Sequence, residues 1–93
     1  MIPKRFMILG NEIKVRRVKT IPKHKHCRGL WVPDKNLIYI VKDSNIDIEW
    51  QTLKHEQVHA ILDYMGLDDL SADEKFVDLF GSILHQIEKT AEY

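Results

Sequence analysis

Apolar and polar residues alternate along the first half of the chain in the pattern of short β-strands. The apolar run Phe6 to Leu9 is followed by the turn dipeptide Gly10-Asn11 and then by EIKVRRV, so we expect a hairpin over residues 5–18. Residues 20–29 combine proline, glycine and several cationic side chains, which indicates a loop. The apolar runs GLWV and LIYIV then flank Pro33-Asp34-Lys35-Asn36, which predicts a second hairpin whose turn begins at proline.

The second half of the chain has the spacing of amphipathic helices. Several capping candidates lie within Ser44 to Asp47, and apolar residues then recur up to Gly66, a residue type that commonly follows a helix. We expect another helix to begin at Ser71, with an apolar stripe that is marked by Phe76, Phe80, Ile83 and Ile87 and widened by Val77, Leu79 and Leu84. This order predicts an α+β fold in a single domain, residues 1–93, with a three- to four-stranded N-terminal sheet followed by two helices.

The composition is that of a globular protein. Hydrophobic residues make up 44% and charged residues 30% of the chain, which excludes an intrinsically disordered protein. No apolar run approaches the length of a membrane span, and the N-terminal run Phe6 to Leu9 is too short for the core of a signal peptide. The single cysteine, Cys27, has no partner for an internal disulfide. We therefore expect a cytoplasmic protein with no membrane partner.

The net charge of zero conceals an asymmetry between the two halves of the chain. Residues 1–33 carry nine Lys or Arg and one acidic residue, a charge of +8, whereas residues 34–93 carry five and thirteen, a charge of −8. We favour the interpretation that the two halves simply fold against each other. The alternative is that the basic segment Lys14 to Arg28 binds nucleic acid or an acidic partner protein.

Candidate metal ligands occur in His55-Glu56-Gln57-Val58-His59, within the first predicted helix. Residues i and i+4 of a helix project from one face, so His55 and His59 can bind one metal ion together. Glu56 is turned by about 100° from His55, where it can reach a metal-bound water without being a ligand. Zinc hydrolases use two such nitrogen ligands, a nearby carboxylate and an open coordination position. The competing interpretation is a chance pair of histidines, and a tetrahedral site needs a third protein ligand.

The second predicted helix offers that third ligand. Glu74, Asp78 and Gly81 lie along one stripe, and glycine within a helix costs about 1 kcal/mol relative to alanine, which indicates that another backbone approaches there. If that backbone belongs to the histidine helix, Glu74 points at the histidines and Asp78 lies beside them as a hydrogen-bond acceptor. A capping box, Ser71-x-x-Glu74, is the rival role for Glu74, and a solvated acid is the rival role for Asp78. The histidine pair leads us to favour the ligand role for Glu74.

This constellation resembles the gluzincin metallopeptidases, which pair HExxH on one helix with a later glutamate that is followed four residues on by an aspartate. A closer resemblance is to the small ImmA/IrrE-type and phage-encoded metallopeptidases. The matching segments are GLWVPDKNLIYI, HEQVHAIL and EKFVDLFGSIL, within residues 29–87. The resemblance implies a small zincin-like core.

The resemblance also implies a zinc-dependent metalloendopeptidase. Zn²⁺ would be held by His55, His59 and Glu74, and would activate a water and polarise the peptide carbonyl. Glu56 would act as the general base and return the proton to the leaving amine. The strand Leu37 to Val41 would line the cleft and pair with an extended peptide or protein substrate. The alternative is a catalytically inactive zincin-fold module that binds a repressor, another protein or nucleic acid through its basic half.

Overall fold

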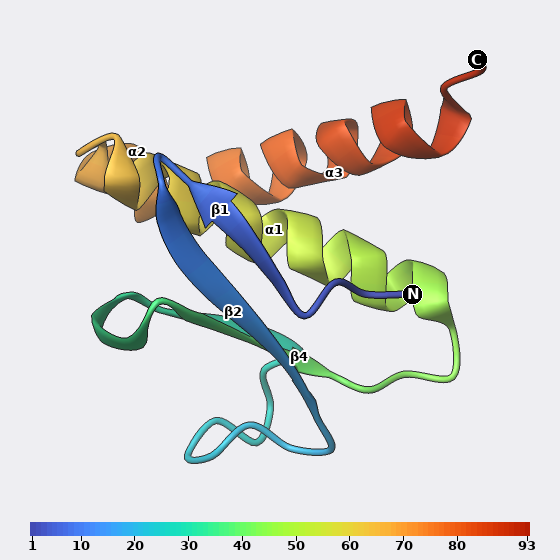
Figure 1. Ribbon diagram of the computed structural model, residues 1–93, viewed down its shortest axis with the longest axis horizontal. Helices are drawn as coiled ribbons and strands as arrows, with labels where there is room; N and C mark the ends of the chain where they lie inside the picture. The colour runs from blue at the N-terminus through green and yellow to red at the C-terminus, as the bar shows by residue number, and fades with distance from the viewer.

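In the computed structural model, which describes residues 1–93, a four-stranded mixed sheet is covered on one face by helices (Figure 1). The strands are β1 (Arg5–Ile8), β2 (Asn11–Val18), β3 (Gly29–Val32) and β4 (Leu37–Val41). The helices are α1 (Ile46–Tyr64), the single turn α2 (Asp68–Ser71) and α3 (Glu74–Thr90). Because α1 lies between the sheet and α3, the molecule has three layers. The α+β class and both predicted hairpins are confirmed.

The strand order is β1-β2-β4-β3, in which the two antiparallel hairpins are joined by a parallel pairing of β2 with β4. The first turn lies one residue earlier than predicted, at Leu9 and Gly10, whose φ values are 48° and 81°. Positive φ at both positions is the type I′ geometry that matches the twist of a hairpin. Since β4 has a neighbour on each side, the prediction that Leu37–Val41 pairs with a substrate is wrong. The free edge on that side of the sheet belongs to β3.

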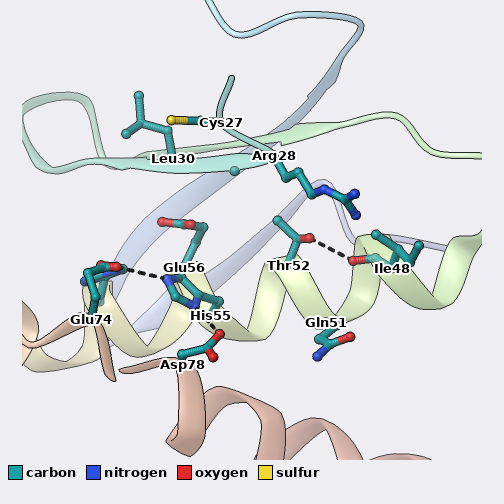
Figure 2. Close-up of a pocket in the computed structure, with 12 residues that line it drawn as sticks. Cys27, Arg28, Leu30, Ile48, Gln51, Thr52, His55, Glu56, Glu74 and Asp78 are labelled. Atoms are coloured by element: carbon teal, nitrogen blue, oxygen red, sulfur yellow. Dashed lines mark hydrogen bonds and ion pairs between the residues drawn. The ribbon is translucent and has the colours of Figure 1, made fainter. Parts of the chain in front are cut away.

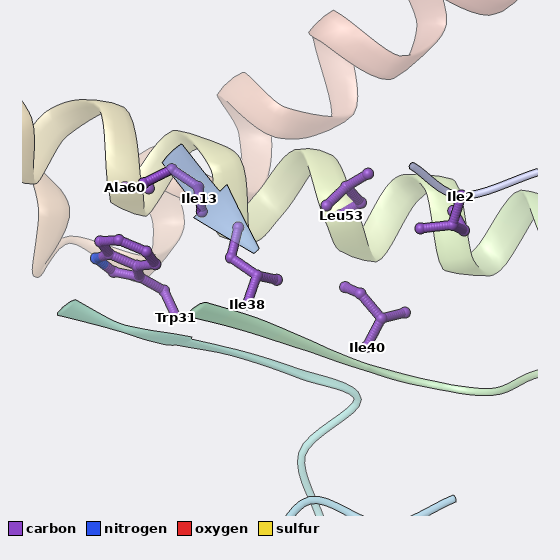
Figure 3. Packing of buried hydrophobic residues seen from close by; sticks show 7 residues of the cluster. All are labelled: Ile2, Ile13, Trp31, Ile38, Ile40, Leu53 and Ala60. Atoms are coloured by element: carbon purple, nitrogen blue, oxygen red, sulfur yellow. The ribbon is translucent and has the colours of Figure 1, made fainter. Parts of the chain in front are cut away.

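The main core lies between the sheet and α1 (Figure 3). The buried apolar side chains that fill it are Ile2, Ile13, Trp31, Ile38, Ile40, Leu53 and Ala60. A second cluster, made by Val58, Leu62 and Val77, joins α1 to α3. Two faces of α1 are therefore buried, one against each neighbouring layer. On a helix with 3.6 residues per turn, His55 and His59 fall on the strip between these two faces.

α3 contacts α1 through only part of the predicted apolar stripe, since Val77 is buried in that contact and Phe76 and Leu84 pack against it. Phe80, Ile83 and Ile87 of that stripe are 45%, 48% and 59% exposed. The contact runs instead through Val77 and Gly81, both buried, because the face that carries a glycine allows the closest approach of the two helices. Despite the exposed apolar residues, no helix of the protein has both the length and the apolar character needed to cross a membrane.

One ion pair joins the basic N-terminal half to the acidic half. The Arg17 guanidinium donates to both carboxylate oxygens of Glu49, at 2.6 and 2.9 Å, and the backbone N–H of Asp43 donates to the same carboxylate at 3.1 Å. The Glu49 side chain is completely buried. The hydrogen bonds from Arg17 lower the pKa of the Glu49 carboxyl, although burial alone would raise it. The remaining Lys and Arg side chains of residues 1–33 are exposed and make no ion pair.

We expect the Arg17–Glu49 pair to make the protein less stable in acid. Because the folded pKa of Glu49 lies below its ordinary value of 4.5, the pair contributes stability above that pH and loses it as the pH falls through the folded pKa. The Glu49→Gln variant should lower the free energy of unfolding at neutral pH by about 1–2 kcal/mol. It should also lose part of the acid dependence. Urea denaturation at neutral pH and at about pH 3 measures both effects.

The matched control is Glu12→Gln, on the exposed face of β2, which should unfold like the wild type at both pH values. If the free energy of unfolding of the Glu49→Gln protein depends on acid as strongly as that of the wild type, this role for the pair is contradicted.

Candidate metal centre

Three side chains from two helices converge at the N-terminal end of α3. They are His55 and His59 of α1 and Glu74, the first residue of α3, and their ligand atoms all lie within 4.8 Å of one another. Glu74 Oε1 is 2.7 Å from His59 Nε2, and Glu74 Oε2 is 3.5 Å from His55 Nε2. The imidazoles are half-buried, whereas the Glu74 side chain is 67% exposed. The fold thus brings together the three side chains predicted as ligands.

Glu74 does not cap its own helix. The N-cap of α3 is Asp73, whose carboxylate accepts a hydrogen bond from the backbone N–H of Phe76 at 3.1 Å. Ser71 ends the preceding turn, α2. The predicted helix start at Ser71 and the rival capping box are therefore wrong, because Asp73 supplies the cap in their place. The Glu74 carboxylate is left free to face the histidines.

Each imidazole has a polar side chain near its Nδ1 atom. Asp78 Oδ1 lies 3.5 Å from His55 Nδ1 (Figure 2), which agrees with the predicted position of Asp78 beside the histidine pair. Ser71 Oγ lies 3.4 Å from His59 Nδ1 and donates to the His59 carbonyl oxygen at 3.3 Å. An acceptor at Nδ1 favours the tautomer in which Nε2 is free to bind a metal. Sequence reasoning missed Ser71 here, because its spacing to Glu74 also fits a capping box.

Glu56 is buried beside the histidine pair, on the side of α1 that faces β3 (Figure 2). β3 passes directly over it at Gly29, where an added Cβ would lie 2.6 Å from Thr52 Cγ2 and 3.1 Å from Glu56 Cγ. Burial, helped by the negative charge of Glu74, raises the pKa of Glu56 to about 7, while the backbone N–H of Trp31 opposes the rise. A dication bound by the histidines would also oppose this rise in the pKa of Glu56.

A cavity of about 700 Å³ opens between α1, the start of β3 and the start of α3. The three candidate metal ligands, His55, His59 and Glu74, lie at one end of this cavity (Figure 2). Its lining consists of Cys27, Arg28, Gly29, Leu30, Ile48, Gln51, Thr52, His55, Glu56, His59, Glu74 and Asp78. No tyrosine is among these residues, so the cavity contains no phenol that could stabilise an oxyanion. Tyr64 donates to Asn36, and His85 lies 3.0 Å from Asp47 at the far end of α3.

The chain matches no protein-family model, no curated protein and no solved structure. The likeness to gluzincins therefore rests on the residues of this chain and on their arrangement. The protein has only one group of three side chains that could hold a metal ion together, namely His55, His59 and Glu74. The histidines and the cysteine of the loop before β3 do not form a second one.

β3 presents backbone groups along this cavity, of which the Trp31 N–H interacts with Glu56. The Val41 N–H donates to the Arg28 carbonyl oxygen at 2.8 Å, which places Arg28 in the ladder with β4. In an antiparallel ladder the inward-facing residues alternate with outward-facing ones. The N–H and C=O groups of Gly29 and Trp31 therefore face away from β4, toward α1 and the cavity. An extended peptide can form a further strand at such an edge.

We expect the purified protein to bind one zinc ion per chain and Glu74→Gln to weaken that binding. The loss should exceed the roughly 10- to 100-fold effect of removing an outer-shell partner, because a ligand oxygen itself is replaced. Elemental analysis gives the stoichiometry, and competition with a chromophoric chelator gives the affinity. The control Asp69→Asn, an exposed acid outside the cluster, should bind like the wild type. Equal affinities of the Glu74→Gln and wild-type proteins would exclude Glu74 as a ligand.

We also expect the helix contact at Gly81 to control the metal affinity. A Cβ at this position would lie 3.1 Å from His55 Cα and 3.2 Å from His55 N, so the larger side chain of Gly81→Val must push α3 away from α1. Glu74 would move with α3, and zinc affinity should fall by about tenfold or more. Chelator competition measures the affinity, and circular dichroism shows whether α3 stays folded. Gln86→Val, at an exposed position of the same helix, is the control and should leave the affinity unchanged.

Proposed function

We propose that this protein is a zinc-dependent metallopeptidase built on a small zincin-like core, with Glu56 as the general base. The observation that carries the proposal is the convergence of His55, His59 and Glu74 on one point, with the buried Glu56 carboxyl beside them. The order of the elements, a mixed sheet over the HExxH helix and then a helix that begins with a glutamate, supports the same conclusion.

The donor set fits zinc. Two imidazole nitrogens and one carboxylate are a set that catalytic zinc takes, with a fourth position open to water or substrate. Nitrogen and oxygen ligands around one tetrahedral zinc ion lie about 3.3 Å apart, so the three ligand atoms, now within 4.8 Å of one another, would draw together when the ion binds. When bound, zinc lowers the pKa of a water and polarises a carbonyl group.

Glu56 is assigned the role of base from its position. It follows His55 directly in α1 and points into the space between the histidine pair and β3. A carboxylate there can take a proton from the attacking water and deliver it to the leaving amine. The cavity wall over Glu56 is the backbone of Gly29, where a Cβ would lie only 3.1 Å from Glu56 Cγ, so a side chain at position 29 would crowd the carboxyl.

The free edge of β3 supports a peptide as substrate. Gly29 offers a backbone donor and acceptor and Trp31 offers a carbonyl acceptor beside the proposed catalytic groups, and such an edge binds extended main chain irrespective of most side chains. The strand that we assign to substrate binding is therefore β3, in place of the predicted β4.

The exposed basic side chains of residues 1–33 favour a second candidate, a catalytically inactive module that binds nucleic acid or an acidic protein such as a repressor. Only Arg17 of this set is used in an internal ion pair. The two candidates differ in what they require of Glu56, since phosphate binding by lysine and arginine does not involve it.

We expect Glu56→Gln to separate the two functions. The variant should bind zinc as tightly as the wild type, but should cleave a fluorescein-labelled, unfolded casein at least about 100-fold more slowly, because the proton acceptor is lost. Fluorescence release from the zinc-loaded proteins measures the rate, with Glu12→Gln as the control. Absence of cleavage by the zinc-loaded wild type would overturn the peptidase proposal. Duplex DNA binding that weakens steeply with salt and is the same in both proteins would favour the alternative.

A further inference from the structure

The cavity beside the candidate metal centre has charges of opposite sign at its two ends. The acidic side chains Glu56, Glu74 and Asp78 lie with the histidines. Arg28 is the only lysine or arginine in the lining. It immediately precedes β3, and its guanidinium extends along the N-terminal half of α1 toward Ile48 (Figure 2).

The Arg28 guanidinium makes no ion pair with any acidic residue of the chain. The side chains that share its end of the cavity are those of Ile48, Gln51 and Thr52, which are uncharged. The Thr52 hydroxyl donates to the Ile48 carbonyl oxygen at 2.8 Å, so it is already engaged. Arg17 on β2, by contrast, is held by Glu49 through two hydrogen bonds.

A guanidinium of this kind matches a carboxylate. Its N–H groups form a planar fork that can donate two parallel hydrogen bonds to the two oxygens of one carboxylate. The three acidic residues at the other end of the cavity repel a carboxylate. The two ends together favour one position for a substrate carboxylate, over the N-terminal half of α1 and away from the histidines.

The direction of β3 tells which part of a peptide reaches Arg28. β3 and α1 run side by side in the same direction, since Gly29 lies against Thr52 and the Trp31 indole N–H donates to Asp63 at 2.7 Å. A peptide that adds to the free edge in the more stable, antiparallel sense runs the opposite way. Its residues therefore pass the histidines first and Arg28 afterwards.

We propose that Arg28 is a specificity-determining residue that binds a substrate carboxylate on the C-terminal side of the scissile bond. The proposal rests on the proposed function for the place of that bond. Two groups supply this chemistry: the side chain of an aspartate or glutamate, and the free C-terminus of a short peptide.

The test is a selection for binding, which does not depend on cleavage. Zinc-loaded Glu56→Gln protein, with Arg28 intact or changed to Gln, is incubated with a random library of soluble peptides, and the retained peptides are sequenced by mass spectrometry. Arg16→Gln in the same background is the matched control, because Arg16 is exposed on β2 outside the cavity. We expect acidic residues at one position, or free C-termini, to be enriched with Arg28 and with the control, and not with Arg28→Gln.

Synthetic versions of one retained peptide then distinguish the two sources of the carboxylate. Fluorescence anisotropy should show about tenfold weaker binding when the responsible group becomes a glutamine side chain or a C-terminal amide. Arg28→Gln should bind the acidic and neutral versions equally. Retention of no peptide at all, or the same peptide preferences with and without Arg28, would overturn the proposal.

The same peptides, offered to zinc-loaded protein with Glu56 intact, keep this inference separate from the proposed function. If acid-selective binding is found but no peptide is cleaved, the peptidase proposal fails and the carboxylate subsite stands. If Arg28→Gln slows the cleavage of acidic and neutral peptides equally, Arg28 does not set specificity, and the inference fails while the peptidase proposal stands.

Discussion

The arrangement of the candidate site depends on one contact between two backbones, that of α3 at Gly81 with that of α1 at His55. Because residue 81 has no side chain, the position of its missing Cβ is only 3.1 Å from His55 Cα. Glu74 lies seven residues earlier, about two helical turns along the same face of α3. A contact this close fixes α3 beside the histidine helix, and so places Glu74 against His59 and Asp78 against His55. The same glycine thus sets both the packing of the two helices and the arrangement of the candidate ligands.

α1 carries both the core and the site, and this follows from its place in the middle layer. Leu53 and Ala60 pack on the sheet and Val58 and Leu62 on α3, which leaves one strip of the helix free to line a cavity. Glu56 lies at the border between that strip and the buried face toward the sheet. Its carboxyl is therefore desolvated by its position in the fold, which is the main cause of its raised pKa.

Local rules of sequence predicted most of the elements and the three candidate ligands, because hairpin turns, helical spacing and the HExxH pattern are all short-range features. Gly81 carried longer-range information, since a glycine within a helix indicates a close neighbour. The parallel pairing of β2 with β4 could not be predicted in this way, because no local feature of either strand selects its neighbour. The start of α3 was misplaced because Ser71 and Asp73 are both good caps, and only the tertiary position of Ser71, against His59, decides between them.

The charges of the cavity give the two proposals a common physical basis. Three carboxyl groups lie together with two imidazoles at one end, where a dication would offset their negative charge. Bound there, a dication would make this end of the cavity attractive to a polarised carbonyl oxygen. It does not neutralise Arg28, which lies at the other end. A peptide segment with a carboxylate a short distance beyond the scissile bond would then meet complementary charge at both points, so binding and orientation would come from the same interactions.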